Sequence, residues 1–314
     1  MIRVLAIGHL SYDITFPLDA FPGENTKIQI PEIYESAGGP AANAAALLAF
    51  WKIPTAFTGL VGADSYGLKA VMDLKTRGVD TRLVENRENY STPLSFILVN
   101  KKNGSRTIVN RKGEGVLHPE DPRKFFAPFL SNPPELLLFD GHEPEVSLAA
   151  LEYFPEAITV LDAGSRRKGT ELLAMRVDYC IASERFAREF IPGRPSEHTF
   201  SCRELLEALL TLGVRCPAVT LGERGCCFLE TQEKAEAFLL PAYPARAVDT
   251  TGAGDIFHGA FAAALLQGKS FREALRVATA ASALSVERYG GMTSIPTLEE
   301  VEQKITGGNV WRSL

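Results

Sequence analysis

The sequence predicts an α/β protein of three layers, with a mostly parallel sheet between two layers of helices and a small antiparallel sheet attached as a lid. Three observations predict this class. Apolar, strand-like runs alternate with helical runs along most of the chain, as in βαβ units. The first run, residues 3–7, is apolar apart from its first residue and ends at Gly8, as a buried strand would. Extended pieces without helical periodicity interrupt the alternation at about 13–36 and 92–111.

The composition indicates a folded protein that binds a small molecule. The chain has 314 residues, of which 46% are hydrophobic and 23% charged, enough for a large core. The net charge of −5 gives no basic surface for nucleic acid. The apolar run 260–266 is too short to cross a bilayer, and the first residues are too short and strand-like for a signal peptide. We therefore expect a cytoplasmic protein without membrane or nucleic-acid partners.

The cysteines and histidines predict neither a disulfide framework nor a metal site. The five cysteines include no C-x-x-C pair, so we expect reduced and mostly buried thiols. Cys226 and Cys227 are adjacent in a strand-like run and should therefore point to opposite faces of a sheet. The five histidines show no metal-ligand spacing.

The segment after the first strand carries a candidate ligand-binding carboxylate. Asp13 follows the carboxyl end of that strand, which is where open parallel sheets bind their ligands. A carboxylate there can accept hydrogen bonds from hydroxyl groups. The alternative interpretation is a turn residue that caps a loop.

A glycine-rich turn opens the first helix. Gly38 and Gly39 permit an unusual turn, and Pro40 suits the first helical position of the alanine-rich run that follows. Asn43 lies about one turn into this helix, where its amide would cost helix propensity. That cost is explained if the amide binds a ligand. Otherwise Asn43 faces solvent.

The extended pieces are predicted to pair into one small sheet. Strand-like runs at 13–16 and 27–30 precede two further strands at 94–99 and 105–110. Asn103-Gly104 between the last two is a strong hairpin signal. Because such a sheet offers an exposed face and exposed edges, we expect a homodimer that forms through it.

The middle of the chain reads as further units of the main sheet. Strands are expected at 135–140, 158–162 and 177–182, separated by helices. Asp140 and Asp162 end two of them, again at the ligand-binding edge. A tight turn over 222–225 then joins two strand-like runs, which predicts antiparallel strands at one side of the sheet.

The most informative stretch is 247–259. Gly252, Ala253 and Gly254 come directly before a strongly helix-forming run and therefore fall at a helix N-terminus. Unpaired N–H groups and the helix dipole favour an anion there, and small residues let a phosphate approach. Asp255 in the same turn could take a proton from a hydroxyl group. The alternative is an ordinary capped helix, but the second glycine motif upstream favours phosphoryl transfer.

On these motifs the chain resembles the ribokinase-like sugar kinases, also called the PfkB family, over essentially its whole length. Asp249–Asp255 matches the C-terminal signature of that family. Gly38–Asn43 matches the N-terminal signature, which continues to Gly59, Gly62 and Gly67. The extended segments lie where the family carries its lid.

The resemblance implies a ribokinase-like fold and one kinase domain, residues 1–314. It implies an ATP-dependent carbohydrate kinase that transfers the γ-phosphoryl group to a hydroxymethyl group of a monosaccharide, with Mg²⁺ accompanying ATP. Asp255 would be the general base, and Gly252, Ala253 and Gly254 the anion hole. The sugar would be held by Asp13, Gly38, Gly39 and Asn43, with Arg106 and Asn110 on the lid side.

The resemblance also assigns the nucleotide and cation sites. Thr220, Gly222 and Gly225 match the loop that approaches the nucleotide, and Ala281 and Ser285 lie where adenine packs in relatives. Many relatives bind a monovalent cation such as K⁺. Its ligands would come from Asp249, Thr251, Gly291 and Ser294.

The chain departs from the family at the Asn-x-x-Glu motif that supports magnesium. Ser183 stands in the asparagine position and Phe186 in the glutamate position, so Glu184 would have to substitute. Stretches 38–42, 105–108 and 257–259 are most similar to the ketohexokinase and sulfofructose kinase branch.

The sequence does not identify the acceptor molecule. Lys27 with Arg111 would suit an anionic sugar, and His142 could line the same side of the pocket, but the preferred interpretation is solvated charge on a strand edge. His258 shares a helix face with Asp255, and its preferred interpretation is a packed helix histidine. A nucleoside kinase of the same fold is the alternative function. A non-catalytic or dinucleotide-binding protein ranks lower, because no G-x-x-G follows Gly8.

Overall fold

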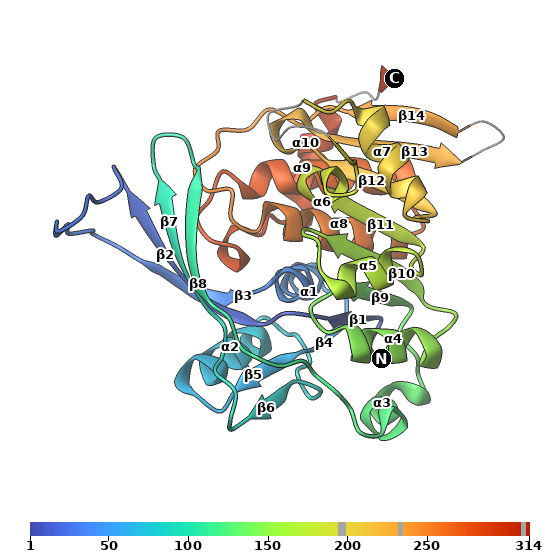
Figure 1. The fold of residues 1–314 in the computed structure, drawn as a ribbon, viewed down its shortest axis with the longest axis horizontal. Coiled ribbons are helices and arrows are strands. Elements are labelled where there is room, and N and C mark those ends of the chain that lie inside the picture. Colours follow the sequence, from blue (N-terminus) through green and yellow to red (C-terminus); the bar gives the residue numbers. More distant parts are fainter. Residues whose placement is uncertain (194–198, 232–234, 309–311) are drawn as a thin grey trace.

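The computed structural model describes residues 1–193, 199–231, 235–308 and 312–314. Within these residues the strands form a nine-stranded sheet, a four-stranded sheet that projects from its side, and the short pair β5 (Leu60–Gly62) and β6 (Glu85–Arg87) (Figure 1). The four-stranded sheet is the lid sheet below. No helix among the described residues combines the length and apolarity that crossing a membrane requires.

The nine-stranded sheet is parallel over most of its width. The strand order is β15-β14-β13-β12-β11-β10-β9-β1-β4. The strands are β1 (Val4–Ile7), β4 (Thr55–Thr58), β9 (Leu136–Phe139), β10 (Ile158–Ala163), β11 (Tyr179–Ser183), β12 (Cys216–Thr220), β13 (Cys226–Thr231), β14 (Ala235–Leu240) and β15 (Arg312–Ser313). Every pair from β12 to β4 is parallel, whereas the pairs from β12 to β15 are antiparallel. This confirms the predicted change of direction at one side of the sheet.

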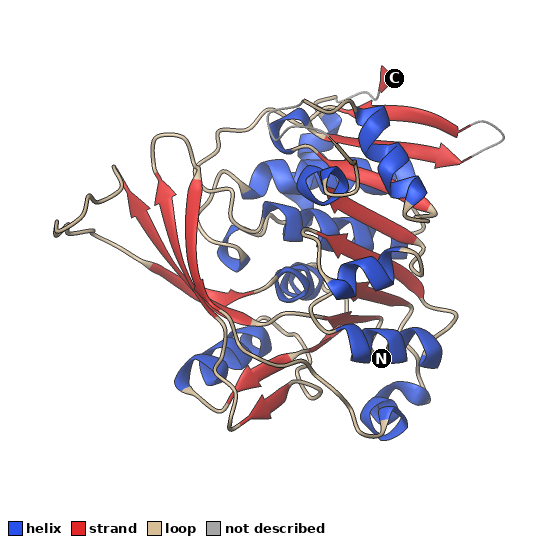
Figure 2. Ribbon diagram, viewed as in Figure 1, coloured by secondary structure: helices blue, strands red, loops and turns tan. Residues whose placement is uncertain are grey.

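Helices cover both faces of this sheet, which confirms the three layers (Figure 2). One face packs against α1 (Pro40–Phe50), α8 (Ala253–Leu266), α9 (Phe271–Ser285) and α10 (Leu298–Thr306). The other face packs against α3 (Pro122–Leu130), α4 (Pro144–Tyr153), α5 (Lys168–Ala174), α6 (Glu184–Arg188) and α7 (Cys202–Thr211). Strand alternation divides the side chains between the two cores. Cys226 lies in the first core and Cys227 in the second, as predicted, and all five cysteines are free thiols.

The helix boundaries follow local capping signals. Ser270 and Glu273 form a capping box at the start of α9, and the Asp64 side chain caps α2 (Ser65–Thr76). Pro40 stands at the first position of α1, as predicted.

The lid sheet has the strand order β3-β2-β7-β8, formed by β2 (Ser11–Leu18), β3 (Tyr34–Gly38), β7 (Leu94–Asn100) and β8 (Arg106–Arg111). The predicted hairpin around Asn103-Gly104 is present, and both outer pairs are antiparallel. The central pair, β2 with β7, is parallel. The chain between β2 and β7 passes through β3, α1, β4, β5, α2 and β6, and such a long crossover permits parallel pairing. Residues 27–30, predicted as a strand, are irregular and exposed instead.

Candidate active site

The loop before α8 forms the helix start at which the sequence predicted an anion-binding site. Gly252 is the N-cap with φ +75°, and an added Cβ would lie 2.8 Å from Gly291 Cα, so glycine is required by both conformation and space. A Cβ added to Gly254 would have no described atom within 4 Å. The first-turn N–H groups therefore border open space, which an anion can enter.

Asp255 lies in the first turn of α8 and contacts the other glycine motif. Asn43 Nδ2 donates a hydrogen bond of 2.5 Å to Asp255 Oδ2. The contact exists because α1 and α8 approach closely at Gly259, where an added Cβ would lie 3.0 Å from Ala44 O. Burial raises the pKa of Asp255, while the hydrogen bond from Asn43 and the neighbouring His258 lower it. Asp255 is thus a carboxylate whose basicity is increased by its surroundings and moderated by one amide.

Asn43 is buried, so the solvent-facing alternative is wrong. Its amide nitrogen is committed to Asp255, and its Oδ1 is buried without a hydrogen-bond partner among the described residues. Contact with a sugar hydroxyl, as the sequence predicted, would satisfy that oxygen.

The turn before α1 fits closely against β2. Gly39 has φ +111°, and an added Cβ would lie 2.1 Å from His9 O. A Cβ added to Gly38 would lie 2.0 Å from Asp13 Oδ2. Only glycine at both positions lets the turn lie against Asp13.

Asp13 belongs to a row of polar side chains across the lid sheet. The register aligns it with Ser36 on β3 and Ser95 on β7, and Ser95 with Asn110 on β8. Burial raises the pKa of Asp13 to about 6, against hydrogen bonds from Ser11 and Ser95. The sequence did not single out Ser95, because only the strand register places it beside Asp13.

The tip of the lid touches the loop before α8. Arg106 Nη1 donates to Thr250 Oγ1, and Thr250 Oγ1 donates to Gly104 O at 3.3 Å. The positive charge of Arg106 also lowers the pKa of Asp255. Arg106 and Asn110 are exposed, and Arg111 instead donates to Thr92 O.

Two loops bring the four predicted cation ligands together. Asp249 is buried, its Oδ1 accepts the Thr251 N–H and its Oδ2 the Gly290 N–H, both at 2.8 Å. Ser294 Oγ donates to Gly291 O, and Thr251 Oγ1 is buried without a partner among the described residues. The described residues contain no cluster of His, Cys, Asp or Glu that could hold a metal ion. A buried hydroxyl oxygen without a partner among these residues is a suitable ligand for a monovalent cation.

The predicted nucleotide loop is open at one glycine and packed at the other. Gly222 has φ +60°, and no described atom lies within 4 Å of an added Cβ. Gly225 has φ +98°, and an added Cβ would lie 2.0 Å from Leu240 O, so it shapes the turn against β14. The Thr220 hydroxyl donates to Ala182 O at 3.4 Å.

The residues assigned to adenine and magnesium have other contacts. Ala281 and Ser285 are fully buried, so neither side chain offers surface to a nucleotide in this conformation. The side chain of Ser282 between them is partly exposed and donates to Ala253 O. Glu184 forms an ion pair with Arg224 at 2.6 Å. Ser183 caps α6 and Phe186 is buried in the core, so neither can replace the missing motif.

Asp162 and His258 form a buried pair beneath Asp255. His258 Nδ1 lies 3.2 Å from Asp162 Oδ2 and 2.6 Å from Gly254 O, and its Nε2 lies 3.2 Å from Ile181 O. Burial raises the pKa of Asp162 to about 6, although His258 opposes the shift. The pair connects the start of α8 to β10 and β11.

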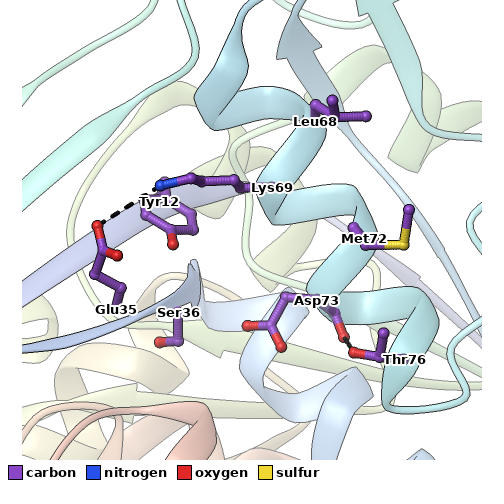
Figure 3. Close-up of a pocket in the computed structure, with 8 residues that line it drawn as sticks. All are labelled: Tyr12, Glu35, Ser36, Leu68, Lys69, Met72, Asp73 and Thr76. Atoms are coloured by element: carbon purple, nitrogen blue, oxygen red, sulfur yellow. Dashed lines mark hydrogen bonds and ion pairs between the residues drawn. The ribbon is translucent and has the colours of Figure 1, made fainter.

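A separate pocket of about 470 Å³ lies between the lid sheet and α2 (Figure 3). Tyr12 lines it, and alternation along β2 places Tyr12 on the face opposite Asp13. Lys69 reaches across it to Glu35 at 3.8 Å (Figure 3). This pocket is therefore not part of the site around Asp255.

Comparisons with known proteins show which family the whole chain resembles. The family model described as pfkB family carbohydrate kinase matches residues 1–298. The ribokinase of Haemophilus influenzae is 28% identical over 301 residues, covering 95% of this chain and 96% of that protein. The ATP-dependent ribose-1-phosphate kinase of Halopiger xanaduensis is 29% identical, covering 96% and 97%. The ribokinase structure from Arabidopsis thaliana, complexed with ribose and ATP, is 27% identical with a TM-score of 0.77, covering 97% and 99%.

Proposed function

The chain belongs to the pfkB family of carbohydrate kinases and has the ribokinase-like fold, and from this premise we propose that it transfers the γ-phosphoryl group of ATP to a hydroxymethyl group of a monosaccharide. The observation that carries the proposal is the contact of Asp255 with Asn43 at the open start of α8. It joins the two glycine motifs into one site, with a base beside an anion-binding helix terminus.

In the proposed reaction the Asp255 carboxylate takes the proton of the acceptor hydroxyl. The hydroxyl oxygen then forms a bond to the γ-phosphorus as the bond to the bridging oxygen of ADP breaks. The N–H groups at Gly252–Gly254 stabilise the charge on the transferring phosphoryl oxygens, because they are fixed in place before the reaction. Asp13 and the Asn43 amide oxygen hold hydroxyl groups of the sugar on the lid side.

Two cations are part of the proposal. Mg²⁺ would arrive with ATP and neutralise phosphate charge. Glu184, which directly follows β11, would support the ion through water after its ion pair with Arg224 breaks. K⁺ would be held by the loops of Asp249 and Ser294, where the Thr251 hydroxyl, which has no partner in the described part of the chain, fits a ligand set of hydroxyl and carbonyl oxygens. Its charge would support the adjacent helix start.

We also propose that the whole chain acts as one kinase domain and that two copies associate through the lid sheet. Strand β8 is exposed along its length and ends the strand order of that sheet, and Ile108 and Val109 are 47% and 59% exposed. Light scattering at micromolar concentration should give the mass of a dimer. A monomer at that concentration would contradict the dimer without affecting the kinase proposal.

An acceptor panel with ADP release as the readout tests the function. Ribose is the first acceptor to test, since several relatives are ribokinases, followed by deoxyribose, ketoses and adenosine. ATP-dependent turnover of at least one sugar is expected. Preference for adenosine would establish the nucleoside kinase alternative. Failure to phosphorylate any sugar or nucleoside would contradict the proposal. A preference for fructose would support the likeness to the ketohexokinase branch, which stays a prediction.

A further inference from the structure

Three side chains that the reaction does not use gather at the carboxyl edge of the central sheet. They come from the loops that follow three neighbouring strands, β1, β9 and β10. The rings of His9 and His142 are stacked, with centroids 4.3 Å apart and an interplanar angle of 22°. Arg167 Nη1 lies 3.0 Å from His142 Nδ1 and within reach of Nε2 as well. His9, His142 and Arg167 are called the basic cluster below.

The guanidinium of Arg167 is incompletely paired. Its Nη2 donates to Ser165 Oγ, but its Nε is buried without a partner among the described residues. Those residues also give Arg167 no carboxylate within ion-pair distance, although its charge lowers the pKa of the nearby Asp162. A partly buried arginine in this state is costly, and an oxyanion is the ligand its fork of N–H groups fits.

The adjacent carboxylate cannot satisfy the cluster. Asp140 Oδ2 accepts the N–H groups of His9 at 2.8 Å and Ala41 at 3.2 Å, and Oδ1 accepts that of His142 at 2.9 Å. Asp140 therefore fixes the two backbone segments that carry His9 and His142, and the start of α1. It positions the two rings at the carboxyl edge of the sheet without contacting their ring nitrogens.

We propose that the basic cluster binds an anionic group of the acceptor, so that the substrate is a sugar that already carries a phosphate group. The inference rests on the proposed kinase function and specifies its acceptor. The anionic group lies on the part of the sugar that points away from Asp255, since the carboxylate and the transferring phosphoryl group would repel it there. Lys112, at the end of the lid, adds positive charge that acts on both histidines.

The ionisation of the two histidines is consistent with this role. Burial, together with the nearby positive charges of Arg167 and Lys112, lowers the pKa of both His9 and His142 to about 3. Both rings are therefore neutral at pH 7 in the free protein, and each has one N–H to donate. A bound phosphate would offset the positive charges of Arg167 and Lys112 that act on these rings.

The proposed anion site does not include Lys27 and Arg111, the residues that the sequence suggested for an anionic sugar. Arg111 is committed to Thr92 O, and Lys27 lies exposed in the irregular segment between β2 and β3. The sequence did not indicate Arg167, because Asp162 was the only candidate ligand residue recognised at the end of the preceding strand.

The test compares phosphorylated sugars with their unphosphorylated parents, using ribose 1-phosphate, fructose 1-phosphate and fructose 6-phosphate. The wild-type protein should have a kcat/KM at least about 10-fold higher for one phosphorylated sugar than for its parent. Arg167→Gln should remove this preference through an about 10- to 100-fold loss, the usual effect of deleting a charged hydrogen-bond donor. A parent sugar that is used as well as its phosphorylated form would overturn the inference and leave the kinase function intact.

Arg166→Gln is the matched control. Arg166 precedes Arg167 but pairs with Glu171 at 2.7 Å and covers the Phe190 ring, outside the cluster. It should keep the wild-type preference. Arg167→Lys should recover part of it, and thermal unfolding verifies that each variant is folded. A preference that survives Arg167→Gln in the folded variant would contradict the assignment.

Calorimetry without ATP separates this inference from the proposed function. If no sugar is phosphorylated, the kinase proposal fails, but binding can still be measured. The phosphorylated sugar should then bind the wild-type protein and Arg166→Gln, and bind Arg167→Gln at least about 10-fold more weakly. Equal affinity of all three proteins for the phosphorylated sugar would overturn the anion site itself.

Discussion

The two sides of the candidate active site are built differently. On the core side, Asp255 is fixed by Asn43 and by the close packing of two buried helices. On the lid side, all six residues of β8 are exposed, and Arg106 reaches the core through one hydroxyl, Thr250. In the proposed reaction, the core side carries the groups that must be placed accurately for phosphoryl transfer, and the exposed side carries the groups that would select and cover the acceptor. Substitutions on the core side should therefore change kcat, and those on the lid side KM.

The largest effect is expected on the core side, from Asp255→Asn. Removing the base should lower kcat by about 10²- to 10⁴-fold while sugar binding, measured by calorimetry, changes little. Asp19→Asn, at an exposed aspartate that pairs with Lys101, is the control and should leave kcat unchanged. A kcat near wild type in Asp255→Asn would remove the distinction between the two sides.

The next effect concerns the backbone at the helix start. Gly252 and Gly268 have nearly the same φ, +75° and +77°, but only Gly252 faces a close backbone neighbour, Gly291. Gly268→Ala should lose about 1–2 kcal/mol of unfolding free energy for the left-handed conformation alone. Gly252→Ala should lose about 2–4 kcal/mol and also lower kcat, because the N–H groups move. Urea unfolding measures both. Equal losses for the two variants, with full activity, would show that the contact with Gly291 is unimportant.

The third effect is expected at Asp13, which lies on β2 of the lid sheet. Its pKa is about 6 in the folded protein and near 3.8 when unfolded, so the folded state disfavours the charged form. Ionised Asp13 therefore lowers stability above pH 6, and this cost disappears as the pH falls from about 6 towards 3.8. Asp13→Asn should raise the unfolding free energy by about 1–3 kcal/mol at pH 8, with less gain at pH 5. A gain that does not depend on pH would contradict the pKa assignment.

The smallest effect is expected on the exposed side, from Arg106→Gln. An exposed polar contact is worth about 0.2–1 kcal/mol, so KM for the sugar should rise by only about 2- to 5-fold, with kcat nearly unchanged. Steady-state kinetics with one sugar provide the measurement. A large loss of kcat instead would mean that the lid takes part in the chemical step.

Local sequence patterns were sufficient for the parts of the site that lie within one element. The glycines before α8 and α1, the hairpin at Asn103-Gly104 and the strand-end carboxylates could be predicted because turn chemistry and helix starts are local properties. The three layers could be predicted because strand-like and helical runs alternate along the chain. The opposite faces of Cys226 and Cys227 could be predicted because successive side chains alternate along a strand.

Contacts between distant elements could not be predicted in the same way. The bond between Asn43 and Asp255 depends on how α1 packs against α8, and Ser95 joins Asp13 only through the register of β2 and β7. The parallel direction of that pair follows from the intervening crossover, not from either strand. Residues 27–30 have the composition of a strand but find no partner among the described strands.

The pH dependence of kcat in Asn43→Ala tests most directly whether Asp255 is the base. The Asn43 hydrogen bond lowers the pKa of Asp255 against the effect of burial, so its removal raises that pKa. Because the base must be ionised, activity should then be lost at a higher pH as the solution is acidified. The acid limb of the profile should shift upwards in Asn43→Ala and stay in place in Asn132→Ala, a control at an exposed residue. An acid limb that does not move, or that moves to lower pH, would contradict the account.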